Sequence, residues 1–123
     1  MPIVHDALVR VEVEDLDSAL ETYRALAGTN EVTRFRFGGI DLAWVGRFLL
    51  LAGPTAELAL VRRTATLLVE DIDAARTLVA DSGGKILEEP SPAPNGARMI
   101  ARHADGAVFE YIETPGATKA SDA

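Results

Sequence analysis

Apolar and polar side chains alternate along the segment from Leu8 to Val13. Because successive side chains of a β-strand point to opposite faces, this alternation predicts a strand with one apolar face. That face is formed by three valines, Val9, Val11 and Val13. The opposite face carries one leucine and two charged side chains, Leu8, Arg10 and Glu12.

The apolar spacing changes directly after this strand and predicts a helix. Apolar side chains recur at intervals of three and four residues, at Leu16, Ala19, Leu20, Tyr23 and Leu26. Asp15 precedes them as a candidate N-cap, because its carboxylate can accept hydrogen bonds from the first backbone N–H groups. Gly28 stands where a residue in the left-handed conformation would end the helix.

Three short strand patterns follow this helix, at residues 32–37, 40–45 and 48–51. Gly38-Gly39 is a two-residue hairpin signal between the first two, and Gly46-Arg47 is a weaker one between the last two. The first half of the chain therefore predicts the element order βαβββ.

The second half of the chain repeats the first. Val13 to Ala19 reads Val-Glu-Asp-Leu-Asp-Ser-Ala, and Val69 to Ala75 keeps five of these seven residues, 69 − 13 = 56 positions later. A strand pattern at 65–69 and a helix pattern at 72–79 are followed by Gly83-Gly84 and by strand patterns at 85–88, 98–102 and 107–112. A junction reused at about half the chain length predicts two copies of one structural module.

We therefore predict a single α+β domain built from tandem βαβββ modules. Module one spans about residues 5–53, module two spans about residues 62–114, and residues 115–123 form a tail. The connection from Ala52 to Arg63 mixes polar and apolar residues, with no flexible Gly/Ser stretch after Gly53, and leaves open whether the modules pair within one chain or with a second chain. Residues 89–96 contain three prolines, which predicts a loop in this segment.

Composition limits the classes of partner. The formal net charge of −7 and the pI near 4.7 disfavour binding to the phosphate backbone of a nucleic acid. The same acidity either favours cationic ligands or simply serves solubility. The sequence has no cysteine, which excludes disulfides and thiolate metal sites. With neither a signal-peptide pattern nor a membrane-length apolar run, we expect a cytoplasmic protein with no membrane partner.

The duplicated Val-x-Asp-Leu/Ile-Asp-x-Ala junction resembles the vicinal oxygen chelate superfamily, which includes glyoxalase I, extradiol dioxygenases and bleomycin-resistance proteins. The Asp-Gly turn before Phe109-Glu110-Tyr111-Ile112 strengthens the likeness, which extends from about Ala7 to Glu113. The resemblance implies paired modules whose mixed sheet curls into a cup, and commonly a homodimer.

The resemblance also implies four positions for the ligands of a divalent metal inside the cup. Counted from the junctions, they fall on Leu8, Leu50, Thr64 and Glu110. Leucine has no lone pair to donate and threonine is a poor neutral ligand, so Glu110 alone is a metal ligand of the usual kind. We therefore expect no metal and no other cofactor, with a site relocated to His5 or His103 as the alternative.

With Leu8 pointing inward, strand alternation predicts which other side chains line the cup. The predicted ligand-binding residues are Leu8, Arg10, Glu12, Trp44, Phe48, Leu50, Thr64, Thr66, Arg98, Val108, Glu110 and Ile112. Trp44 and Phe48 are candidate stacking surfaces, and the alternative for either ring, favoured for Trp44, is that it fills core.

Glu110 has two interpretations. As a carboxylate among apolar neighbours it would be a general base or a counter-charge for a cationic ligand. Alternatively, Arg10 or Arg98 neutralises it in an ion pair, as is usual for buried carboxylates.

These features lead to three functional hypotheses and leave open whether the protein is an enzyme. The first is a metal-free protein, similar to bleomycin-resistance proteins, that sequesters a hydrophobic or cationic small molecule. The second is a metal-independent isomerase or lyase with Glu110 as its catalytic base. The third is a glyoxalase-like or dioxygenase-like metalloenzyme with a relocated metal site. We expect a homodimer in each case.

Overall fold

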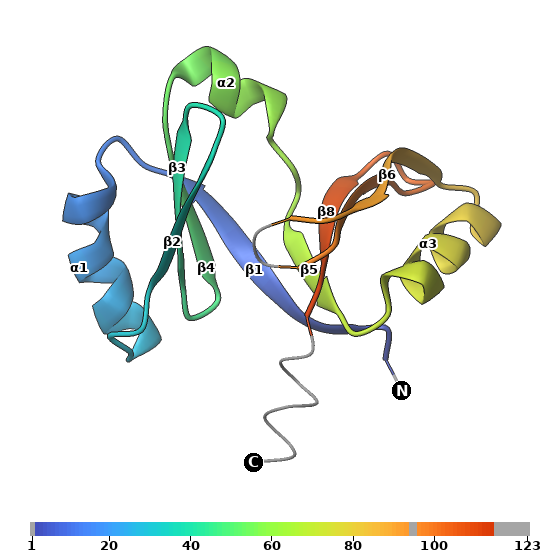
Figure 1. The fold of residues 1–123 in the computed structure, drawn as a ribbon, viewed down its shortest axis with the longest axis horizontal. Coiled ribbons are helices and arrows are strands. Elements are labelled where there is room, and N and C mark those ends of the chain that lie inside the picture. Colours follow the sequence, from blue (N-terminus) through green and yellow to red (C-terminus); the bar gives the residue numbers. More distant parts are fainter. Residues whose placement is uncertain (1, 94–95, 115–123) are drawn as a thin grey trace. The chain divides into compact units, whose positions relative to one another are not determined.

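The computed structural model describes residues 2–93 and 96–114, and its chain divides into two compact units. The N-terminal module is Leu8–Arg62, and the C-terminal module combines the residues up to Ala7 with those from Arg63 onward. The predicted tail, 115–123, lies outside the described residues. Figure 1 labels most of the helices and strands of the two modules.

The N-terminal module contains the four-stranded order β2-β3-β4-β1. Its strands are β1 (Val4–Glu12, which begins in the C-terminal module), β2 (Thr33–Phe37), β3 (Ile40–Val45) and β4 (Phe48–Ala52). β1 and β4 pair in parallel, and the β2-β3 and β3-β4 pairs are antiparallel. Helix α1 (Leu16–Ala27) packs on β3 and β4, and the short helix α2 (Thr55–Leu60) follows β4.

The C-terminal module repeats this plan with the order β5-β8-β7-β6. Its strands are β5 (Thr66–Val69), β6 (Lys85–Ser91), β7 (Arg98–Arg102) and β8 (Val108–Glu113). β5 and β8 are parallel, and the β8-β7 and β7-β6 pairs are antiparallel. Helix α3 (Ile72–Asp81) packs on β6, β7 and β8 (Figure 1). The predicted α+β class and the tandem βαβββ modules are confirmed.

The repeated Asp residues cap their helices as the sequence predicts. The Asp15 carboxylate accepts a hydrogen bond from the backbone N–H of Ser18, and the Asp71 carboxylate accepts from Asp73 and Ala74. Gly28 ends α1 with φ of 69°, a conformation that glycine adopts without a steric penalty. The shared motif therefore sets where each strand gives way to its helix.

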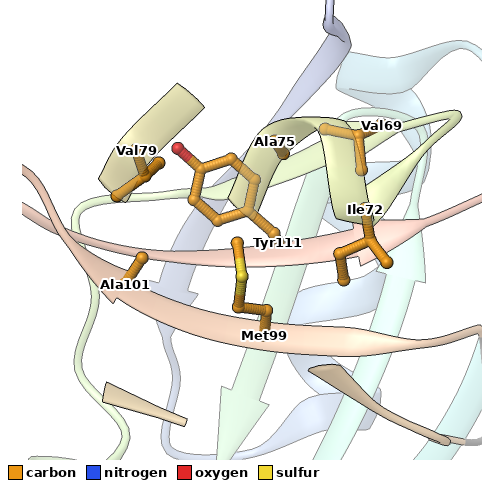
Figure 2. Packing of buried hydrophobic residues seen from close by; sticks show 7 residues of the cluster. All are labelled: Val69, Ile72, Ala75, Val79, Met99, Ala101 and Tyr111. Atoms are coloured by element: carbon orange, nitrogen blue, oxygen red, sulfur yellow. The ribbon is translucent and has the colours of Figure 1, made fainter. Parts of the chain in front are cut away.

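Each helix buries an apolar stripe on its own sheet. In the C-terminal module the buried cluster joins α3 to the facing strands, with Val69, Ile72, Ala75, Val79, Met99, Ala101 and Tyr111 as members. Figure 2 shows the side chains of Tyr111 and Met99 extending from β8 and β7 toward α3. The face of each sheet that α1 or α3 covers is thus occupied by core.

The connection from Ala52 to Arg63, for which the sequence indicated no helix or strand, contains helix α2, whose Leu58 side chain is buried. One expectation from the sequence needs correction. The predicted loop at 89–96 is wrong for its first three residues, because β6 continues through Pro90 to Ser91. β6 is the edge strand, where a proline without an N–H group can be accommodated. Residues 94–95 of this segment lie outside the described residues.

None of the helices formed by the described residues is long and apolar enough to cross a membrane.

Candidate functional site

We call the sheet face that α1 does not cover the helix-free face of the N-terminal module. The pairing of β1 with β4 shows which side chains lie on it. Arg10 lies opposite Leu49, and Glu12 lies opposite Leu51. Leu49 and Leu51 therefore share the face of Arg10 and Glu12, the face on which alternation also places Leu8. All three leucines are buried, and each has at most 3% of its surface exposed.

Leu50 and Phe48 point to the other face, so their predicted place beside Leu8 is wrong. Leu50 is fully buried against Leu16 and Leu20 of α1, and Phe48 packs on the same cluster. The Phe48 ring also meets Tyr23 of α1 edge-on, with ring centroids 4.9 Å apart. β4 is apolar throughout, so its sequence does not show which alternate residues face the helix.

The charged side chains of the helix-free face have partners within the N-terminal module. Arg62 donates two hydrogen bonds to the Glu12 carboxylate, at 2.7 and 2.9 Å. These hydrogen bonds hold the pKa of Glu12 below its usual range. The Arg10 guanidinium donates to the backbone carbonyl of Val61 at 2.7 Å. Both residues are thus anchored by the segment that follows α2.

Trp44 lies on β3, where its indole N–H donates to the Gly46 carbonyl at 2.8 Å. The side chain lines an open pocket of about 420 Å³ together with Ala27, Thr29, Glu31, Thr33 and Gly46. This pocket lies between the C-terminal end of α1 and the β2-β3 pair. The indole is partly exposed, so Trp44 does not serve as fully buried core.

A single row of residues crosses the four strands of the C-terminal module. Thr66 on β5 lies opposite Glu110 on β8, Glu110 lies opposite Ile100 on β7, and Ile100 lies opposite Glu88 on β6. Their strand neighbours Met99, Ala101 and Tyr111 pack against α3. By alternation the row therefore lies on the helix-free face.

Glu110 is held by two side chains of this face. The Thr66 hydroxyl donates to Glu110 Oε1 at 2.8 Å, and Arg98 Nε donates to Glu110 Oε2 at 3.3 Å. The structure thus pairs Glu110 with Arg98, one of the two partners expected from the sequence. Both carboxylate oxygens accept hydrogen bonds from the protein, and the Arg98 cation balances the negative charge.

Arg98 also contacts a second carboxylate. Its NH1 group donates to Glu88 Oε1 at 3.1 Å, and Arg63 NH2 lies 4.0 Å from Glu88 Oε2. We call these five residues the Glu110 cluster: Arg63, Thr66, Glu88, Arg98 and Glu110. Sequence reasoning missed Arg63 and Glu88 as members.

A β-bulge explains why Glu88 was missed. Ile86 pairs with Ala101 and packs on the α3 side, while Glu88 pairs with Ile100 on the opposite side. In a regular strand, residues two positions apart would share a face. The register shift between Ile86 and Glu88 reverses this relationship and brings Glu88 to the Glu110 cluster.

The remaining predicted site residues of this module border the cluster. Ile112 lies opposite both Arg98 and Leu68 in the strand register and has 2% of its surface exposed. The backbone N–H of Thr64 donates to the Val108 carbonyl at 2.7 Å, which brings these two residues together where β5 begins. The Thr64 residue is exposed and Val108 is partly buried.

The two histidines contact residues outside the Glu110 cluster. His103 Nε2 lies 2.6 Å from the Tyr111 hydroxyl, and its ring stacks on Phe109 with centroids 4.4 Å apart. Burial raises the pKa of Tyr111 above its usual range. His103 and Tyr111 border an open pocket of about 380 Å³ beside the end of α3. His5 Nε2 lies 3.3 Å from Thr114 Oγ1.

The residues present do not fit a divalent metal ion. At three of the four positions that the resemblance implies, the chain has Leu8, Leu50 and Thr64. The strand register makes Leu49, which lies opposite Arg10, the counterpart of Glu110, which lies opposite Thr66. Leu49 thus replaces Leu50 at this position. Arg98, 3.3 Å from Glu110, would repel a cation at this carboxylate. Within residues 2–93 and 96–114, no three His, Cys, Asp or Glu side chains are grouped so that they could hold a metal.

The sequence matches no protein-family model. It is 30% identical over 124 residues to a protein of Synechocystis sp. named "Probable lactoylglutathione lyase", with 85% of this chain and 91% of the relative covered.

Similar folds are found among solved structures. An uncharacterized protein from Methanosarcina mazei is 38% identical, with a TM-score of 0.84 and coverage of 92% of this chain and 94% of that chain. Methylmalonyl-CoA epimerase from Mycobacterium tuberculosis is 20% identical, with a TM-score of 0.71 and coverage of 97% and 95%. At this identity the likeness to the epimerase concerns the fold alone.

Proposed function

The chain belongs to the vicinal oxygen chelate superfamily, and we propose that it binds a small organic molecule without a metal ion, at the Glu110 cluster of its C-terminal module. The observation that supports this proposal is the double hydrogen bonding of Glu110 by Thr66 and Arg98. A carboxylate held in this way is a fixed polar anchor beside the apolar side chains of Ile100 and Ile112. Such a combination is typical of small-molecule sites.

The surroundings of Glu110 narrow the kind of ligand. Ile100 and Ile112 flank the cluster in the strand register and are only 1% and 2% exposed, so a ligand that reaches Glu110 meets an apolar base, which favours a ligand with an apolar body. The Arg98 ion pair already balances the Glu110 charge, which weakens the sequence-based argument for a cationic ligand. The proposed activity is therefore sequestration of an apolar molecule that carries a polar group.

A ligand screen in the presence of a chelator tests this proposal. Binding compounds should raise the melting temperature of the chelator-treated protein, because a ligand that binds the folded state stabilises it. They should also shift the methyl NMR signals of Ile100 and Ile112. Glu110→Gln should alter the affinity of these compounds, whereas Glu14→Gln, which removes the same charge at an exposed position, should not. Compounds that shift only methyl signals remote from the cluster would contradict the proposal.

A second candidate function is a metal-independent lyase or isomerase with Glu110 as the base. The name of the Synechocystis relative favours this candidate and suggests lactoylglutathione as the first substrate to assay. A carboxylate has about four acceptor sites, so Glu110 can receive a proton while Thr66 and Arg98 hold it in place. Turnover in the presence of a chelator that is abolished by Glu110→Gln would support the enzyme. Turnover retained by that variant would exclude Glu110 as the base.

A further inference from the structure

Glu88 differs from the rest of the Glu110 cluster in its exposure. The side chains of Arg63, Arg98 and Glu110 are 13%, 17% and 15% exposed, whereas that of Glu88 is 54% exposed. Two largely buried cations therefore share a carboxylate that is in contact with solvent.

The backbone that carries Glu88 is also the least constrained part of the row. β6 is the edge strand of its sheet, and register shifts lie on both sides of Glu88, toward Ile86 and toward Ser91. A bulged edge strand has fewer ladder hydrogen bonds to hold it than a central strand has. Glu110, by contrast, lies on β8 between β5 and β7 and is fixed by Thr66.

The Glu88 carboxylate faces two guanidinium groups, one through a hydrogen bond and one through a longer ion pair. One oxygen accepts from Arg98 NH1 at 3.1 Å, and the other lies 4.0 Å from Arg63 NH2. Guanidinium groups bind carboxylates through paired N–H donors and keep their charge at every physiological pH. Ion pairs that include an exposed partner are weak, so an external carboxylate can compete for the same donors.

We propose that Arg63 and Arg98 form a binding site for the carboxylate group of an organic anion, and that Glu88 occupies this site until the ligand replaces it. The inference rests on the proposed function and assigns a charge to the ligand of the same site. Displaced Glu88 moves into solvent, while Glu110 keeps Arg98 in place. The arginine pair thus provides a local positive site in a protein whose net charge is −7.

Benzoate is the probe for this site, with benzamide and benzylamine as its neutral and cationic counterparts. The measurement is the dissociation constant from backbone amide shifts of Arg98, Ile100 and Glu110 in the full chain. Glu88→Gln removes the competing charge, and benzoate should then bind about fivefold more tightly, the factor expected when a weak internal competitor is lost. Benzamide should not gain affinity.

Glu89→Gln is the matched control. Glu89 is the next residue, is also exposed, and forms its ion pair with Arg76 of α3 at 2.6 Å. The variant therefore makes the same change in net charge without affecting the arginine pair, and its benzoate affinity should equal that of the wild type. Adding Arg63→Gln to Glu88→Gln should remove the gain in affinity.

Equal benzoate affinity in the wild type and Glu88→Gln would overturn the inference, as would an equal gain in Glu89→Gln. If benzoate still shifts Arg98 and Ile100 in that case, the proposed binding function stands without the role of Glu88. If neither the three probes nor any compound from the screen shifts these signals in any variant, the proposed function fails as well.

Discussion

Thr66 and Glu110 lie opposite each other on the parallel strands β5 and β8, and the Thr66 hydroxyl donates a 2.8 Å hydrogen bond to the Glu110 carboxylate. Thr66 has only 1% of its surface exposed. Thr66→Val keeps the shape of the side chain and removes the donor. We expect the free energy of unfolding to fall by about 1–3 kcal/mol, because a partly buried carboxylate oxygen loses its partner. Urea denaturation measures this change.

Thr64→Val serves as the control for that variant. Thr64 is exposed and lies two residues before Thr66, and its backbone N–H, which the substitution keeps, donates to Val108. The same chemical change should alter stability by no more than about 0.5 kcal/mol. Equal effects at the two positions would show that the hydrogen bond to Glu110 contributes nothing specific.

The corrected orientation of Leu50 gives a second prediction. Leu50→Ala should lower the free energy of unfolding by about 2–5 kcal/mol, because the side chain is fully buried against α1 and its loss leaves a cavity. Leu60→Ala is the control, since Leu60 is 77% exposed. A small loss at Leu50 in urea denaturation would contradict its assignment to the core.

Local patterns predicted much of the fold. The repeated Asp15 and Asp71 junctions located α1 and α3, since an N-cap acts through N–H groups two or three residues away. Alternation from Leu8 to Glu12 identified the helix-free face of β1 because its two faces differ in polarity. Such features depend on neighbouring residues alone, so they can be predicted without knowing the tertiary structure.

The errors arose where the deciding contact is distant or the pattern is uniform. β4 carries apolar side chains at every position, so alternation could not place Leu50. The bulge in β6 reversed the face of Glu88, and strand pairing rather than sequence determines such a bulge. The ion pair of Arg98 with Glu110 likewise depends on the pairing of β7 with β8.

The buried phenol of Tyr111 predicts a loss of stability at high pH. Burial raises its pKa above the ordinary value of 10.0 because the charged phenolate is poorly solvated. Above pH 10 the unfolded chain releases this proton while the folded protein keeps it, so stability falls as pH rises. Between pH 9 and 11 the decline in free energy of unfolding should be smaller in Tyr111→Phe than in the wild type.

Tyr23→Phe provides the comparison for Tyr111→Phe. Tyr23 packs edge-on against Phe48 in the other module, and its replacement leaves the Tyr111 phenol and its His103 contact unchanged. The pH dependence of Tyr23→Phe should therefore follow that of the wild type more closely. An identical decline in the wild type and Tyr111→Phe would contradict the assigned role of Tyr111.

The pairing of Glu12 with Arg62 predicts a change that NMR can measure. The Arg62 hydrogen bonds lower the pKa of the Glu12 carboxyl, so Arg62→Gln should raise this pKa toward its ordinary value. Arg34→Gln, which breaks the ion pair with Asp17, should leave it unchanged. Because the Glu12 pair is exposed, neither variant should change stability appreciably. An unchanged Glu12 titration in Arg62→Gln would argue against the pair in solution.

The central claim is that Thr66 and Arg98, rather than a metal ion, hold the Glu110 carboxylate. Its most direct test is the metal content of the protein purified without a chelator, measured by mass spectrometry for the wild type and for Glu110→Gln. We predict far less than one equivalent of transition metal per chain in both proteins. One equivalent in the wild type that is absent from Glu110→Gln would contradict the claim.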